Sequence, residues 1–221
     1  MRPRLLAAGA LAAAAAVLVS GCGSGDDWSR PHPKPSTVGD LGLGFRPAAS
    51  PAPEATITPR PGSWDGVRPS EGYRVILLTA GKDAQTRTLA NAVTKWAEEE
   101  DVSMKTIDAT APDQYVPSIV RAIDMAPDLV ISVGNDLIDP LALVTASHLA
   151  QQFLVVGAEL AEPTENVTAA DWTGASFRGE GLGMSSAYDP ATFTPERAGR
   201  AVRAGVAAVL NGLTGIVIWL D

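Results

Sequence analysis

Polar and aromatic side chains follow several short apolar runs in the later part of this chain. Carboxylates and amides at such positions can hydrogen-bond a polar solute, and an aromatic ring can pack against one. The candidate ligand contacts are Asp83, Asn135, Asp136, Glu159 and Trp172. If the apolar runs are parallel strands, these residues gather at one edge of a sheet, where such sheets bind their ligands. The same residue types would also be common there without a ligand, because Asp, Asn and Gly form exposed turns.

Asp108, Asp136 and Glu159 raise a second possibility, since three acids could converge on a cation as in phospho-receiver domains of similar topology. The export signal described below argues against that role, because it takes the protein away from ATP-dependent kinases. We therefore expect neither a bound metal nor a cofactor.

Enzyme motifs are not found. The sequence holds no Cys/His pair, no H-x-x-x-H, no G-x-S-x-G and no Walker loop. His32 precedes the apolar runs, and His148 lies on a helix with an apolar stripe, where a core-edge or surface histidine is expected. The glycines at 178–183 do not follow a strand in register and so make no dinucleotide fingerprint. The sequence predicts a protein that is not an enzyme.

The elements that would position these residues alternate. Arg74–Ala80 is a continuous apolar run, typical of a strand buried on both faces. Leu89, Val93 and Trp96 then share one helix face. The further predicted strands are 103–108, 128–133, 153–156, 166–172 and 215–220, and the further helices lie around 115–123, from the Asp139-Pro140 start, and from Thr194 to the glycine at 212.

Strands separated by helices predict an α/β fold, a parallel sheet between two helix layers. We expect five or six strands, with Arg74–Ala80 near the centre of the sheet. Residues 173–193 form a Gly/Ser-rich loop between two of the elements.

The N-terminus predicts export. Arg2 and Arg4 precede an apolar run that is too short to span a membrane, and Val-Ser-Gly leads to Cys22. This tetrad resembles the lipobox of bacterial lipoproteins. The resemblance implies cleavage before Cys22, diacylglycerol on its sulfur and an acyl chain such as palmitate on the new amine. Residues 1–21 are then a lipoprotein signal peptide, and the protein is anchored on the extracytoplasmic face of the cell membrane.

Two features of composition complete the organisation. Residues 23–70 hold nine of the 17 prolines, so 22–72 is interpreted as a lipid-anchored, solvated tether in which Trp28, Phe45 and Trp64 are linker residues. The folded domain is then 73–221. Removing residues 1–21 takes away two arginines and no acids, which leaves 15 basic and 25 acidic side chains. This acidic balance argues against nucleic acid as a partner.

Three stretches carry a resemblance to a known family. Ala126–Gly134, Asn166–Trp172 and Ala204–Val217 are similar to segments of the basic membrane lipoproteins, the PnrA-like solute-binding proteins of nucleoside ABC importers. The resemblance covers residues 73–221 and implies one lobe of a type I periplasmic-binding-protein-like fold, a nucleoside or similar small polar ligand, and an ABC permease as partner. Asp83 stands where the family has an aspartate that bonds ribose hydroxyls.

The chain also departs from this family. Family members have two lobes, the sequence stops at the strand from which the second lobe would follow, and residues 81–87 lack the family's stacking aromatic. Two hypotheses follow. The chain is a solute-binding lipoprotein of an importer, or it is a single-lobe envelope lipoprotein that binds a protein or its own copy. The second hypothesis predicts an open apolar rim near Trp172 and Trp219.

Overall fold

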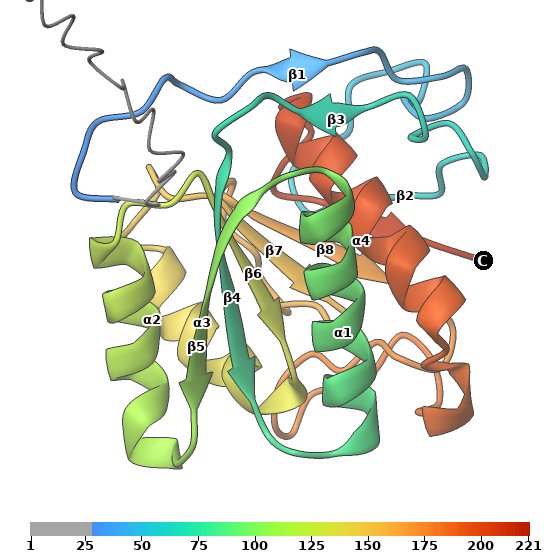
Figure 1. Cartoon of the computed structure of the whole chain (residues 1–221). Coiled ribbons are helices and arrows are strands. Elements are labelled where there is room, and N and C mark those ends of the chain that lie inside the picture. Colours follow the sequence, from blue (N-terminus) through green and yellow to red (C-terminus); the bar gives the residue numbers. More distant parts are fainter. Residues whose placement is uncertain (1–27) are drawn as a thin grey trace, which may run out of the picture.

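The computed structural model describes residues 28–221 as a sheet between two helix layers (Figure 1). The predicted signal peptide and Cys22 lie outside the described residues. Within them, no helix is long and apolar enough to cross a membrane. The predicted α/β fold with a parallel sheet is confirmed.

The main sheet has seven strands, and all six pairings between them are parallel. Their spatial order is β2-β9-β8-β7-β6-β4-β5. In chain order these strands are β2 (Thr56–Ile57), β4 (Arg74–Ala80), β5 (Ser103–Ala109), β6 (Leu129–Val133), β7 (Phe153–Val156), β8 (Val167–Asp171) and β9 (Val217–Trp219).

Two expectations about the sheet were wrong. It has seven strands rather than five or six, because β2 from the predicted tether pairs with β9. β4 lies beside the edge strand β5 rather than at the centre, because every strand after β5 is added on the other side of β4. The buried character of β4 is nevertheless as expected: six of its seven residues are buried, because helices cover both faces of the sheet here.

Two helices cover each face. α1 (Ala84–Glu99) and α4 (Pro195–Leu210) pack together on one face, and α2 (Tyr115–Asp124) and α3 (Ile138–Thr145) pack on the other (Figure 1). Thr194 caps α4, with its side chain accepting from the backbone N–H of Arg197. The expected helix start at Asp139-Pro140 is wrong, because a 3-10 turn at Asn135–Leu137 runs directly into α3 and places Asp139 inside its first turn.

The expectation of a solvated linker is also wrong for residues 28–72, which we call the strap. Phe45 and Trp64 are 1% and 4% exposed and belong to the core on the α1/α4 face. Two short strands of the strap, β1 (Thr37–Val38) and β3 (Arg68–Pro69), pair antiparallel above the amino ends of the main sheet (Figure 1). The proline-rich composition did not prevent packing. Buried aromatic and aliphatic side chains hold the strap against the domain, and a solvated linker would have no such buried side chains.

Candidate functional site

The strand order changes direction between β4 and β6, since β5 lies on one side of β4 and all later strands lie on the other. In parallel sheets, ligands bind outside the carboxyl ends of the strands at this switch point. The turns after β4 and β6 bound a hollow of about 170 Å³ here, and three of the five predicted residues, Asp83, Asn135 and Asp136, line it. The structure therefore brings these three side chains together at the carboxyl edge of the sheet, where the sequence placed them.

Asp83 caps a helix at the hollow, and its carboxylate is also accessible from the hollow. It is the N-cap of α1, with Oδ1 accepting from the backbone N–H of Thr86 at 2.8 Å and Oδ2 accepting from the Thr86 hydroxyl at 2.7 Å. Partial burial acts to raise the pKa of Asp83, but these hydrogen bonds outweigh it and leave the pKa below its ordinary value. The side chain is thus held ionised at neutral pH.

Asp136 approaches the same point from the turn after β6. The Oδ2 atoms of Asp83 and Asp136 lie 3.1 and 3.7 Å from the position that a Cβ on Gly81 would occupy. Gly81 has φ +90°, so glycine leaves this space open and also allows the turn. The Tyr115 hydroxyl donates to Asp136 Oδ2 at 3.1 Å. Two carboxylates therefore face a common space, and a phenol holds one of them from outside the hollow.

The loop 173–193 supplies residues of the site that the sequence did not indicate. Tyr188 and Phe193 line the hollow, and their ring centroids are 5.8 Å apart. The pKa of Tyr188 is raised, first by partial burial and second by the negative charge of Asp83, so the Tyr188 side chain senses this carboxylate. Only the aromatic character of Tyr188 in a Gly/Ser-rich loop could have marked it beforehand.

Glu159 lies elsewhere. It is 4% exposed, accepts from the Ser185 hydroxyl at 2.6 Å and lies 3.3 Å from Arg178 Nε. Together with Glu54 these residues line a separate hollow of about 240 Å³. The turn after β7 is therefore not part of the site at the switch point.

Trp172 is fully buried and so does not face an open cleft. Its indole N–H donates to the Thr192 hydroxyl at 3.0 Å, and its ring packs edge-on against Phe193 at 5.2 Å. Leu220 and Ile218 are also buried. The predicted open apolar rim is therefore wrong at Trp172, which loop 173–193 covers, whereas Trp219 is half-buried.

The three acids considered for a cation are not brought together. Among residues 28–221, no group of three His, Cys, Asp or Glu side chains is placed to hold a metal ion. The hollow has hydrogen-bond acceptors, the side chain of Tyr188 and the ring of Phe193 in its wall, and this lining is suited to binding a polar molecule.

Comparison with known proteins gives no family. No protein-family model and no curated protein matches the chain. Structural neighbours are solute-binding proteins of ABC transporters. One from Aeropyrum pernix K1 is 19% identical with a TM-score of 0.42, over 46% of this chain and 29% of that one. Another, from Conexibacter woesei DSM 14684, is 19% identical with a TM-score of 0.39, over 46% and 36%.

A periplasmic ribose ABC transporter protein from Conexibacter woesei DSM 14684 is 13% identical, with a TM-score of 0.38, and the match covers 68% of this chain and 54% of that one. The matched region thus spans 29% to 54% of the length of these neighbours. At such identities the likeness is one of fold alone.

Proposed function

We propose that this protein is a lipid-anchored, extracytoplasmic protein that binds a small polar solute at the carboxyl edge of its sheet. The observation that carries the proposal is the hollow at the switch point, where Asp83 and Asp136 direct carboxylate oxygens toward one space. The family resemblance of the sequence supports the further proposal that the solute is a nucleoside or a similar molecule and that an ABC permease receives it.

The chemistry of the hollow defines the solute class. Ionised carboxylates accept hydrogen bonds, so the solute should present hydroxyl or ammonium donors. Tyr188 is 41% exposed and adds a ring face on which a sugar or base can pack. The volume of about 170 Å³ is below the ~300–1,000 Å³ of typical ligand pockets, so a small polyol or the ribose end of a nucleoside fits better than a whole nucleoside.

Asp136→Asn should weaken solute binding by about tenfold, equivalent to ~1.4 kcal/mol, because a charged acceptor becomes neutral while its shape is kept. Calorimetry with ribose, a panel of nucleosides and small amino-polyols on the mature chain measures this directly. Asp124→Asn is the matched control, since Asp124 is exposed at the end of α2 and outside the hollow. Equal affinities for the two variants, or no binding of any panel member, would contradict the proposal.

Cys22→Ala should move the protein from the membrane fraction to the medium, or leave the precursor uncleaved, because the acyl chains are then lost. Two or more acyl chains hold a protein on a membrane stably. Detergent phase partitioning of cells expressing each form is the measurement, with Ser24→Ala as a control next to the cleavage site. If Cys22→Ala and the unsubstituted protein partition alike, the anchor is not at Cys22.

A further inference from the structure

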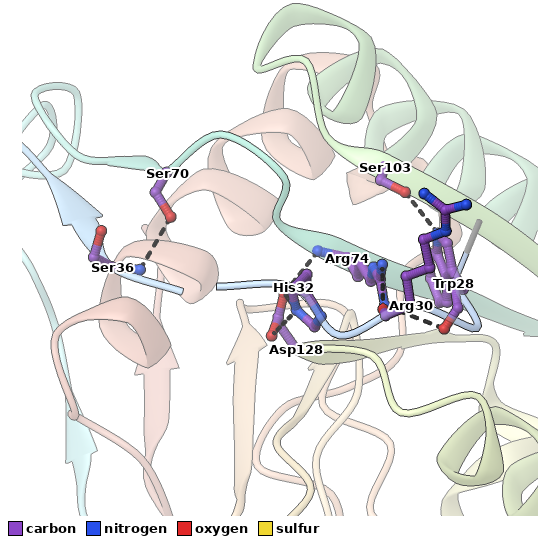
Figure 2. Close-up of polar contacts among 8 residues, drawn as sticks. All are labelled: Trp28, Arg30, His32, Ser36, Ser70, Arg74, Ser103 and Asp128. Carbon is purple, nitrogen blue, oxygen red and sulfur yellow. Dashed lines mark hydrogen bonds and ion pairs between the residues drawn. The ribbon is translucent and has the colours of Figure 1, made fainter. Parts of the chain in front are cut away.

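The first residues that the structure describes lie across the amino ends of three neighbouring strands (Figure 2). The indole N–H of Trp28 donates to the hydroxyl of Ser103, the first residue of β5, at 2.7 Å. The Trp28 ring also has two cations against it, with the Arg74 guanidinium 5.6 Å and the Lys105 ammonium 4.5 Å from the ring centroid. Cation–π contacts of this kind add to the hydrogen bond in fixing the ring.

Arg74 and Asp128 hold the next residues. The Arg74 guanidinium donates to the carbonyl oxygens of Trp28 at 3.3 Å and Arg30 at 3.0 Å. His32 Nε2 lies 2.8 and 2.9 Å from the two carboxylate oxygens of Asp128, which also accepts from the backbone N–H of Arg74 (Figure 2). Because Arg74 begins β4 and Asp128 directly precedes β6, all these contacts lie on the amino edge of the sheet.

The strap stays attached beyond this point. The backbone N–H of Ser36 donates to the Ser70 hydroxyl at 3.1 Å, and β1 pairs with β3 immediately after it. The Thr37 hydroxyl donates to the carbonyl of Leu210 at the end of α4. The chain from residue 28 onward is therefore held against the amino edge of the sheet.

Cys22 precedes Trp28 by only six residues in the sequence. Six residues span at most about 20 Å when fully extended. β4 has seven residues and, at ~3.3 Å each, separates the amino edge from the hollow by roughly the same length. With Cys22 in a bilayer, the amino edge lies near the lipid surface, and turning the hollow toward the lipid would place Trp28 at or beyond the reach of the spacer.

We propose that residues 28–38, the first part of the strap, orient the domain so that the amino edge of the sheet faces the lipid surface and the hollow at the carboxyl edge faces away from it. The proposal rests on the anchoring of Cys22 proposed above. Solute then reaches the hollow from the side away from the membrane.

Energy transfer from the two ends of β4 tests the orientation. Glu71 and Lys82 are exposed, the first just before β4 and the second just after it. Cys22 is the only cysteine, and acylation blocks its thiol, so Glu71→Cys or Lys82→Cys supplies the single labelling site. Each lipidated variant is labelled and placed in phosphatidylcholine vesicles that carry a headgroup-labelled acceptor. Because the labels differ by roughly the length of β4 in height, we expect at least about twofold more transfer from position 71.

A longer spacer provides the matched control. Inserting twenty Gly/Ser residues between Gly25 and Asp26 leaves every contact of the strap intact and should reduce the difference between the two labels. Trp28→Ala with His32→Ala should do the same with the original spacer, provided that its thermal unfolding shows a folded domain.

The outcomes separate the two proposals. Protein that does not bind vesicles at all overturns the anchor, and with it the orientation. Vesicle-bound protein with equal transfer from both labels, or with more from position 82, overturns the orientation alone. A difference between the labels that the inserted spacer leaves unchanged also counts against the strap.

Discussion

Replacing Asp171 by Asn should remove a large part of the pH dependence of stability. Asp171 ends β8 and is fully buried, with Oδ1 accepting from the backbone N–H groups of Trp172 at 2.8 Å and Ser176 at 3.0 Å. Burial raises the pKa of Asp171 from its ordinary 3.8 to about 7; the N–H donors of Ser176 and Trp172 lower it in part, and the negative charge of Glu159 raises it slightly further. The folded protein therefore favours the protonated acid.

The direction in which stability changes with pH follows from this raised pKa. The stability that protonated Asp171 contributes is fully present below about pH 4 and is lost as the pH rises to about 7, where the buried group ionises. A shift of about three pKa units corresponds to a change on the order of 4 kcal/mol across this interval. Asn keeps the Oδ1 acceptor but cannot ionise, so the free energy of unfolding of the variant should gain on the unsubstituted protein by that amount between pH 4 and pH 8.

Urea unfolding of both chains at several pH values measures this difference, and other titrating groups cancel in the comparison. The Oδ2 atom of Asp171 has no hydrogen-bond partner in the described structure, so the amide group of the Asp171→Asn variant also changes the absolute stability. The two proteins are therefore compared by how steeply their free energies of unfolding change with pH. Asp124→Asn, at an exposed carboxylate, should leave the slope unchanged. Parallel curves for Asp171→Asn and the unsubstituted chain would show that Asp171 is not buried with a raised pKa.

The regular elements were predictable because local patterns determine them. The run at β4 and the spacing of Leu89, Val93 and Trp96 identify a buried strand and the inward face of α1, and these residues are buried. The joint position of Asp83, Asn135 and Asp136 was predictable for a related reason. Carboxyl ends of parallel strands meet at one edge, so the order of elements alone brings their turns together.

Contacts made by irregular segments were not predictable in this way. Trp172 follows a strand as Asp83 does, but loop 173–193 folds over it through Thr192 and Phe193. The same loop brings Tyr188 to the hollow and Ser185 to Glu159. No periodic pattern or sequence motif marks these contacts, because they depend on how the 21-residue loop packs against the folded sheet.

The strap gives the second large expected effect. Trp64→Ala should lower the free energy of unfolding by about 3–5 kcal/mol, as expected when a large aromatic leaves a filled core. Trp64 is 4% exposed, packs edge-on against Phe45 at 6.3 Å, and lines a small hollow together with Arg200 of α4 and Leu220. A Trp in a solvated linker would be replaced at no cost, so this variant distinguishes the two interpretations of residues 28–72.

Leu43→Ala is the matched control because Leu43 lies in the same strap, two residues from Phe45, and is 91% exposed. It should change stability by less than about 0.5 kcal/mol. Both variants are compared by urea denaturation of the mature chain at neutral pH. If Trp64→Ala and Leu43→Ala unfold at the same urea concentration, the strap does not belong to the core. If only Trp64→Ala is destabilised, the part of the strap around Trp64 and Phe45 belongs to the folded core, and the domain begins well before β4.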